Sequence, residues 1–393
     1  MRSAFTSRLG MLAFAHLAID AYSSFFSPLL PLLVAKLGLS LTMVGGLVAL
    51  ASITSSFGQP LFGLVSDRLH RPWFVAFGPI VAAVFMSAIG LAHNYATLAT
   101  LLLLAGVGVA AFHPQAAALA SEGATKRGLA MSIFVTGGTL GFSLGPLLAV
   151  SVAGRFGLER TWVAVIPGVL TSAILIPAFL NTKTHTRVRP PRAPLSALRP
   201  VARPLAFLYA IVVSRSAVSY GFMIFLSLYL TANGYSLTRA GAMVTLYLAL
   251  GAFGGFLGGW LADRWGGRRV VQLSFLGAIP LYLGFLFLST GPGLVSLLAG
   301  SFILQSSLPV NVVLGQELSP RHSSTISSLL MGAAWGLGAL IVGPVGAIAD
   351  RYGLHNALLG LSGFLAVGLV CSLVLPDLKR YAPAEIPVEP IPA

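Results

Sequence analysis

Long apolar stretches, each close to the length of one membrane crossing, alternate along the chain with short polar segments. A transmembrane helix needs about 20 predominantly apolar residues. Stretches of this kind cover residues 9–34, 42–65, 73–92, 96–120, 128–152, 161–180, 204–232, 237–261, 269–289, 293–316, 324–348 and 354–375. The pattern therefore predicts an all-α membrane protein with twelve transmembrane helices.

Composition excludes a soluble protein. Of the 393 residues, 56% are hydrophobic and 9% are charged, whereas soluble domains carry about 25% charged residues. Mean hydropathy is +0.89. The first span starts within ten residues of Met1 and lacks a convincing cleavage site after it, so we expect it to remain as the first helix. The single cysteine, Cys371, excludes a disulfide framework and a thiolate metal cluster.

The net charge of +14 could indicate a nucleic-acid partner, but the position of the charge points elsewhere. With a cytoplasmic N-terminus, 18 lysines and arginines fall in inside segments, 5 fall in outside loops and Arg215 lies within a span. This asymmetry follows the positive-inside rule. It predicts cytoplasmic N- and C-termini and leaves no basic face for nucleic acid.

The chain is an internal duplication. A shift of 196 residues places 38–68 on 234–264 without a gap, with 13 identities in 31 positions, and also places 153–158 on 349–354. Parallel repeats are typical of secondary transporters. We therefore expect a six-helix half over 1–180, a cytoplasmic basic linker over 181–203, a second six-helix half over 204–376 related to the first by a pseudo-twofold axis, and a tail over 377–393.

Two loops carry a resemblance to a known family. Residues 63–71 (GLVSDRLHR) and 259–269 (GWLADRWGGRR) resemble the cytoplasmic loop signature of the major facilitator superfamily. Residues 15–22 with 28–33, 112–116 and 316–321 resemble the fosmidomycin resistance subfamily. The resemblance implies the major facilitator fold, alternating access and drug efflux. The first loop departs from the signature because Leu69-His70 replaces the usual glycine.

The same loops contain candidate gate residues. An aspartate at the end of one helix can meet the positive N-terminus of a neighbouring helix, while arginines pair with acids across the interface. The resemblance gives Asp67 this role in the outward-facing state. The full set of predicted cytoplasmic gate residues is Asp67, Arg68, Arg71, Asp263, Arg264, Glu122 and Glu317. The alternative is that these charges only orient the loops.

Ionisable groups inside the membrane are costly and usually functional. Asp20 lies mid-way along the first span and Arg215 mid-way along the seventh, at nearly equivalent positions of the repeat, so they could pair across the pathway. Asp20 is the best proton carrier, and His16, four residues earlier, could share the proton. The alternative is a polar cluster that holds helices together. No metal site is expected, because no third ligand is evident beside His16 and Asp20.

Other polar groups have several possible roles. His113, followed by Pro114 in the fourth span, could serve packing, substrate contact or proton transfer. Gln305 and Asn311 could reach the pathway or act as polar contacts between helices.

The fifth span contains a ladder of small residues that ends at a proline: Gly137, Gly141, Gly145 and Pro146. Small residues at this spacing let two helices approach closely. The ladder also resembles the antiporter motif of the superfamily, which implies export, although Leu147-Leu148 replaces the expected small residues. Close packing alone would explain the glycines equally well.

Enzymatic function is not expected, because the chain lacks His-Glu-x-x-His, Gly-x-Ser-x-Gly and P-loop segments. A channel or structural protein would not need two gate loops in register. We therefore expect a monomeric secondary transporter of the bacterial inner membrane that binds a small-molecule substrate and needs no cofactor. Proton-driven antiport of a drug or metabolite is the leading interpretation, and proton-coupled uptake of an organic anion is the alternative.

Overall fold

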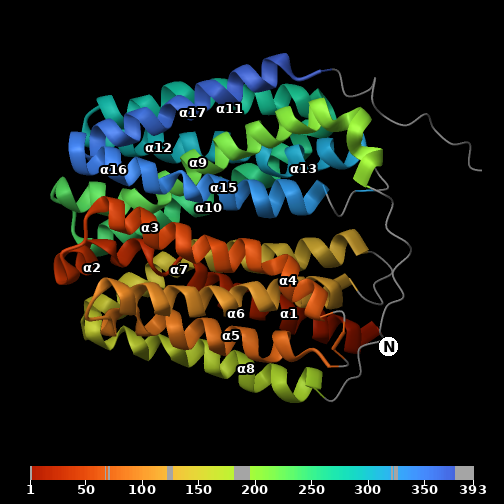
Figure 1. Ribbon diagram of the computed structural model, residues 1–393, viewed down its shortest axis with the longest axis vertical. Helices are drawn as coiled ribbons and strands as arrows, with labels where there is room; N and C mark the ends of the chain where they lie inside the picture. Colours follow the sequence, from red (N-terminus) through yellow and green to blue (C-terminus); the bar gives the residue numbers. More distant parts are fainter. Residues whose placement is uncertain are drawn as a thin grey trace, which may run out of the picture.

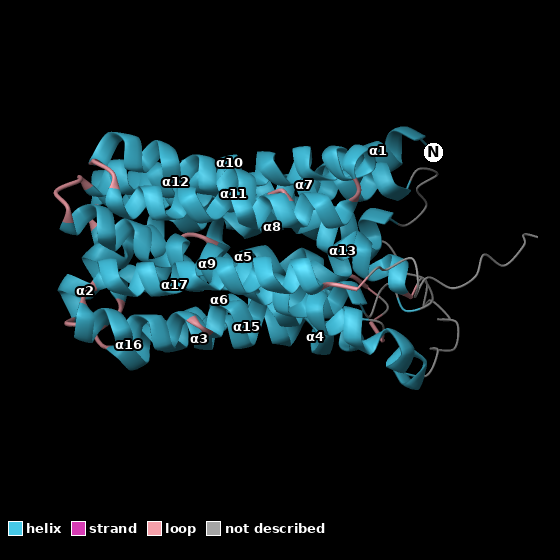
Figure 2. Cartoon of the chain, turned by 90° about the horizontal axis from the view of Figure 1, so that it is seen from above, coloured by secondary structure: helices cyan, strands magenta, loops and turns pink. Residues whose placement is uncertain are grey.

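The protein is described here from a computed structural model covering residues 2–66, 68–69, 71–121, 127–180, 195–319, 322 and 326–376. All regular secondary structure in these ranges is helical, without a strand, and short turns and loops join the helices (Figures 1 and 2). Elements up to residue 180 are α1 (Arg2–Ser23), η1 (Ser27–Leu29), α2 (Leu30–Leu37), α3 (Leu41–Ser52), η2 (Ile53–Phe57), α4 (Gly58–Ser66), α5 (Trp73–Ser87), η3 (Ala88–Leu91), α6 (Tyr95–Ser121), α7 (Arg127–Phe156), η4 (Leu158–Ala164) and α8 (Val165–Leu180). Elements after residue 194 are η5 (Leu195–Val201), α9 (Ala202–Ala232), α10 (Leu237–Trp265), α11 (Gly267–Phe287), α12 (Thr290–Gln305), α13 (Ser307–Leu318), η7 (Ser328–Ala333), α15 (Ala334–Leu340), α16 (Val342–Tyr352) and α17 (Leu354–Val374).

Twelve helical segments within the described residues are long and apolar enough to cross a membrane, which confirms the prediction. Two of them change helix near a proline. The first changes from α1 to α2 around Pro28, and the tenth changes from α12 to α13 at Ser306, shortly before Pro309. Proline lacks the backbone N–H that continues the helical hydrogen-bond ladder, so each break has a local cause.

The duplication is visible in matching local structure. Ser40 and Ser236 cap α3 and α10, and their hydroxyls accept hydrogen bonds from Met43 N (3.1 Å) and Arg239 N (3.3 Å). Two glycine pairs separated by 196 residues also share left-handed backbone conformations, with φ of +62° and +84° at Gly38 and Gly234, and +83° and +84° at Gly157 and Gly353. Identical caps and turns at the 196-residue offset show that sequence repetition is structural repetition.

Helices α1–α8 form one bundle and α9–α17 another, side by side in Figure 1. The glycine ladder of α7 packs on α1, a partner that the sequence pattern did not specify. A Cβ atom at Gly137, Gly141 or Gly145 would overlap the carbonyl oxygens of Ala13, Leu17 and Ala21, respectively. Only glycine permits this approach of the two backbones.

The two ends of the bundle differ. We call the end where α4 and α10 finish and α11 starts the basic end, because it carries Arg68, Arg71, Arg264, Arg268 and Arg269. The opposite, distal end carries the starts of α3 and α10. Contacts between the bundles at the distal end include a hydrogen bond from the hydroxyl of Ser227 to the carbonyl of Pro28 (3.2 Å). Gly45 of α3 also packs so closely on Gly343 of α16 that a Cβ would have no space.

Two π-helical segments, η2 and η7, interrupt the second and eleventh spans. They touch each other across the bundles, and Phe57 at the end of η2 packs on Gly336 of α15. A π-bulge leaves part of the helical ladder unpaired, so these segments are places where a helix bends.

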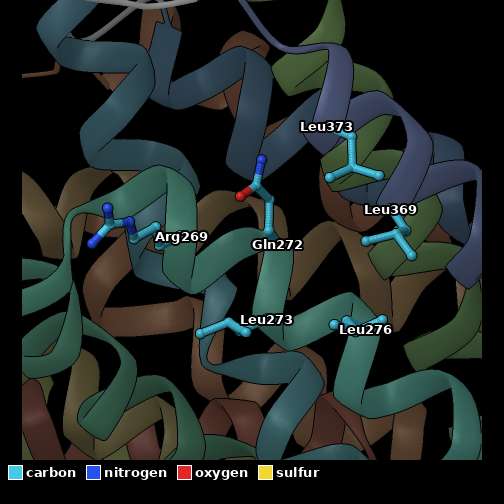
Figure 3. A pocket seen from close by; sticks show the side chains of 6 residues that line it. All are labelled: Arg269, Gln272, Leu273, Leu276, Leu369 and Leu373. Carbon is cyan, nitrogen blue, oxygen red and sulfur yellow. The ribbon is translucent and has the colours of Figure 1, made fainter.

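A groove of about 440 Å³ lies away from this interface, between α11 and α17 near the basic end (Figure 3). It is lined by Arg269, Gln272, Leu273, Leu276, Leu369 and Leu373.

Candidate functional site

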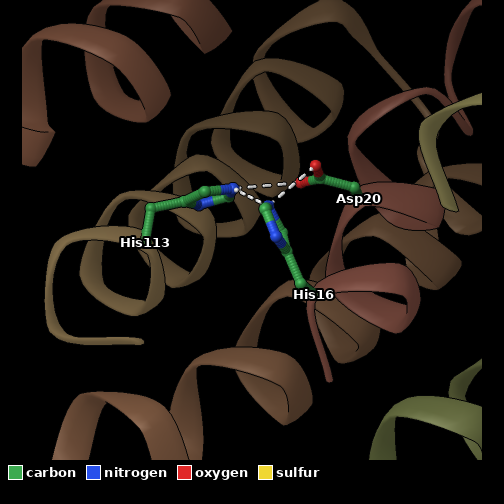
Figure 4. Close-up of side chains that lie close together, drawn as sticks. All are labelled: His16, Asp20 and His113. Carbon is green, nitrogen blue, oxygen red and sulfur yellow. Dashed lines mark hydrogen bonds and ion pairs between the residues drawn. The ribbon is translucent and has the colours of Figure 1, made fainter. Parts of the chain in front are cut away.

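Asp20, His16 and His113 form a compact polar cluster inside the first bundle (Figure 4). His16 and Asp20 lie one turn apart on α1, and His113 approaches from α6. The carboxylate oxygens of Asp20 lie 3.2 Å from His16 Nε2 and 3.1 Å from His113 Nε2, and the two Nε2 atoms lie 3.2 Å apart. The structure thus joins three of the four residues predicted for the cavity.

The outer nitrogens of both rings are bound to backbone carbonyls. His16 Nδ1 lies 2.8 Å from Phe134 O and His113 Nδ1 lies 2.7 Å from Val109 O. A carbonyl oxygen can only accept, so each Nδ1 carries a hydrogen. The ring of Phe134 stacks on His16 with centroids 4.1 Å apart. These contacts fix the orientation of both imidazoles.

The cluster lies against α7 at a glycine. A Cβ atom at Gly138 would overlap His16 Nε2 and would lie 2.7 Å from an Asp20 oxygen. Gly138 therefore leaves the space that the cluster occupies. The sequence pattern of this stretch of α7 indicates a packing ladder but does not identify Gly138 or Phe134 as neighbours of the site, because they come close only when α7 folds onto α1.

The same three residues offer ligand atoms that lie within 4.8 Å of one another, a spacing that would admit a metal ion. The sequence-based expectation of no metal site rested on the lack of a third ligand beside His16 and Asp20. His113 is such a third group, so that reason does not hold. The distances of 3.1–3.2 Å among the three residues also fall in the hydrogen-bond range, as sharing of a proton requires.

Arg215 occupies a separate site in the second bundle, where it is 1% exposed. Its Nη1 donates to Gln305 Oε1 (2.7 Å), its Nη2 donates to Ser216 Oγ (3.3 Å), and its guanidinium lies over the ring of Trp335 at 5.1 Å. Its Nε has no hydrogen-bond partner in the described part of the chain. Gln305, predicted to reach the pathway or join helices, thus holds a buried cation.

The predicted pair between Asp20 and Arg215 is not formed in this structure. Asp20 pairs with the two histidines, and within 4.0 Å no described carboxylate faces Arg215. Asn311 is fully buried, and neither atom of its amide group has a partner among the described residues. Among the described residues, therefore, no carboxylate balances the positive charge of Arg215.

Five of the seven predicted gate residues are among the described residues, and these five lie at the basic end. Asp67 and Glu122 fall outside the described residues. Arg68, Arg71, Asp263, Arg264 and Glu317 are all exposed and form no ion pair within the described ranges. Arg264 instead stacks on Trp260, with its guanidinium 3.8 Å from the ring centroid. The latch predicted for the outward-facing state remains a prediction.

A different aspartate joins the bundles at the distal end. Asp350, at the end of α16, accepts hydrogen bonds from Leu41 N (2.7 Å), Thr42 N (2.8 Å) and the Thr42 hydroxyl (2.6 Å) at the start of α3. We call this contact the distal latch. The repeat contained a signal for it, since Asp350 aligns with Gly154 in an otherwise similar segment, but this difference was not used.

Comparison with known proteins gives a family for this architecture. The sequence pattern of the Major Facilitator Superfamily matches residues 12–342. The fosmidomycin resistance protein of Escherichia coli is 28% identical over 94% of this chain and 92% of its own length. A probable 4-methylmuconolactone transporter of Cupriavidus pinatubonensis is 28% identical over 87% of this chain and 83% of its own length.

The fold has a close structural counterpart. A bacterial homologue of the human lysosomal transporter Spinster, solved in an inward-facing and occupied conformation, superposes with a TM-score of 0.80 at 18% identity, covering 96% of this chain and 97% of the other. The twelve spans, the two repeated bundles and the match over most of the chain place this protein in the Major Facilitator Superfamily of membrane transporters.

Proposed function

We propose that the chain is a proton-coupled secondary transporter that exports a small organic solute by alternating access. The His16–Asp20–His113 cluster carries this proposal, because it is a group of proton acceptors at mid-depth in the first bundle. Ionisable residues at such depth in transporters commonly form proton relays.

The hydrogen-bond pattern sets a minimum number of protons. With Nδ1–H of both rings donating to carbonyls, each neutral ring presents a lone pair at Nε2. Two lone pairs and a carboxylate would then face one another at 3.1–3.2 Å with no hydrogen between them. Such an arrangement is repulsive, so the cluster needs at least one further proton. One imidazolium beside one carboxylate gives a neutral cluster in which the Nε2–H of the charged ring donates to the Asp20 carboxylate.

Removal of that proton would leave three acceptors and one net negative charge in a partly buried site. The repulsion would favour separation of His113 on α6 from Asp20 on α1. Side-chain exposures of 16% for Asp20 and 20% for His113 give the proton a route to the cluster. Protonation thus biases the packing of two helices of the first bundle, which is the differential interaction that coupling requires.

We further propose that the basic end faces the cytoplasm and that this conformation is inward-facing. The distal latch and the close packing of Gly45 on Gly343 support closure of the distal end. The exposed, unpaired charges among the described residues at the basic end agree with an open gate there. On this orientation the protein is a bacterial inner-membrane protein with both termini in the cytoplasm, and we propose that it acts as a monomer without a resident cofactor.

Export is favoured by the likeness to the fosmidomycin resistance protein, which extends over 94% of this chain. Uptake of an organic anion is the second candidate. The buried, uncompensated charge of Arg215 and the likeness to the probable 4-methylmuconolactone transporter favour it. Because the likeness to the fosmidomycin resistance protein supports the leading proposal of export, fosmidomycin is the first solute to test.

The test uses inside-out vesicles with an imposed acid interior and fosmidomycin as solute. Wild type should accumulate the solute, and Asp20→Asn should lose pH-driven accumulation while keeping exchange down the solute gradient. Glu159→Gln is the matched control, because it removes an exposed carboxylate at the distal end that pairs with Lys36. Full proton-driven transport by Asp20→Asn would overturn the assignment of the cluster.

Two controls separate neighbouring interpretations. Efflux of solute from right-side-out vesicles under an inward proton gradient supports export, whereas accumulation under that gradient supports uptake. Activity that a chelator abolishes and Zn²⁺ restores would mean that the cluster holds a metal ion instead of a shared proton.

A further inference from the structure

We propose that the groove between α11 and α17 at the basic end binds one anionic phospholipid, with the headgroup phosphate at Arg269 and an acyl chain along the leucines. Figure 3 shows Arg269 at one side of the groove and Leu273, Leu276, Leu369 and Leu373 along the rest of it. The inference concerns the outer surface of the second bundle and is independent of the solute that the protein carries.

The apolar part of the groove has the direction of a lipid tail. Leu273 and Leu276 follow Arg269 by four and seven residues on α11, so all three lie on one helix face. At 1.5 Å per residue, the two leucines lie about 6 and 10 Å deeper in the membrane than the arginine. Leu273 and Leu276 are about half exposed, at 49% and 56%.

Two hydrogen bonds join α11 to α17 beside the groove. Arg268 Nη2 donates to the carbonyl of Leu373 (2.8 Å), and Gln272 Nε2 donates to the carbonyl of Ser372 (3.1 Å). These carbonyls belong to the last turn of α17, where the helix itself supplies no partner. The two bonds tie α11 to α17 and remove polar acceptors that would otherwise disfavour an acyl chain.

Positive charge gathers at the mouth of the groove. Arg268 and Arg269 are adjacent, and Arg264 lies at the nearby end of α10, stacked on Trp260. Trp260 and Trp265 are half exposed, at 47% and 50%. Tryptophans of this kind mark the level of lipid headgroups. Arg268 Nε is also buried without a hydrogen-bond partner among the described residues. None of the six described residues that line the groove is acidic.

These features select a lipid. Basic pockets between transmembrane helices at the membrane surface suit anionic headgroups, and each arginine near the surface contributes about a five-fold preference for an anionic lipid. Four of the six lining residues are leucines, which a free phosphate ion would not contact. The occupant is therefore an anionic phospholipid of the leaflet at the basic end.

The experiment is native mass spectrometry of the purified full chain with phosphatidylglycerol or phosphatidylcholine. We expect one phosphatidylglycerol to be retained in preference to phosphatidylcholine. Arg269→Gln should reduce that preference about five-fold, and Leu276→Trp should reduce retention of both lipids by filling the groove. Matched controls are Arg8→Gln, at an exposed arginine on α1, and Leu170→Trp, at a leucine of α8 that is 58% exposed.

Equal retention of the two lipids by wild type would overturn the proposal, as would unchanged retention in both groove variants. Displacement of phosphatidylglycerol by millimolar inorganic phosphate would mean a free-anion site and would also contradict it. Because the measurement involves neither solute nor proton gradient, its failure would leave the proposed transport function untouched, and the reverse also holds.

Discussion

The carboxylate of Asp350 on α16 and the hydroxyl of Thr42 on α3 meet at 2.6 Å across the two bundles. The same carboxylate accepts the backbone N–H groups of Leu41 and Thr42, the first residues of α3. The N-terminal N–H groups of a helix lack partners within the helix and carry partial positive charge. One side chain thus satisfies two free donors and complements the helix dipole of the other bundle.

Asp350→Asn should weaken this contact without unfolding either bundle. The amide keeps one acceptor but loses the charge, and the loss of one exposed capping charge amounts to about 1 kcal/mol, roughly five-fold in a two-state equilibrium. Cysteine labelling from the distal side at a position near Pro28 should rise accordingly. Glu159→Gln, which removes a distal-end acid paired within the first bundle, is the control. Equal labelling of Asp350→Asn and wild type would contradict the role of the latch.

Gly154→Asp should create a second latch. Gly154 is the repeat counterpart of Asp350, and the start of α10 is the counterpart of the start of α3. A Cβ at Gly154 meets nothing within 4 Å, so the side chain has space. We expect distal-side labelling to fall below that of wild type and transport to slow. Gly154→Asn separates the effect of charge from that of size, and faster labelling in Gly154→Asp would exclude a capping contact.

Gly138→Ala should disrupt the cluster without removing an ionisable group. The added methyl would overlap His16 Nε2 and would lie 2.7 Å from Asp20. Overpacking of this kind costs about 1–3 kcal/mol of stability. Proton-driven accumulation should fall sharply, while Gly10→Ala, where a Cβ meets nothing within 4 Å, should behave as wild type. Normal coupling in a folded Gly138→Ala protein would argue that the cluster geometry is unimportant.

The sequence predicted the structure well at positions where a residue type rarely occurs without a specific physical reason. Apolar length predicted all twelve spans, and the 196-residue repeat predicted two similar halves, in which the structure shows matched caps at Ser40 and Ser236. Asp20 and His16 were recognised because charge at mid-span is rare and the two lie one helical turn apart. Contacts between spans were harder to predict, because the hydrophobic periodicity of a helix does not show which of its faces packs on which neighbouring helix.

His113 and Arg215 illustrate that limit. The sequence allows several roles for His113, although it completes the cluster, because only the packing of α6 on α1 brings it to Asp20. Arg215 was paired with Asp20 because both lie at mid-depth at equivalent repeat positions. Equal depth in the membrane does not place two residues next to each other within the plane of the membrane. Arg215 lies instead beside Gln305. Asp350 was missed because its partners are backbone N–H groups that no sequence pattern displays.

Arg215 should therefore couple energetically to Gln305 and not to Asp20. The guanidinium donates a 2.7 Å hydrogen bond to Gln305, and removal of one partner leaves a buried polar group unsatisfied. In a double-mutant cycle of Arg215→Met and Gln305→Leu, measured by thermal unfolding in detergent, we expect an interaction energy of about 1–3 kcal/mol.

The parallel cycle of Arg215→Met with Asp20→Asn should be additive within about 0.5 kcal/mol, because the two residues share no hydrogen-bond partner. Unfolding reports the resting conformation, so the same pairs should also be compared by pH-driven transport. Additivity in unfolding with strong coupling in transport would mean that Asp20 and Arg215 pair at another stage of the cycle. Strong coupling in unfolding would contradict the separation of the two sites described above.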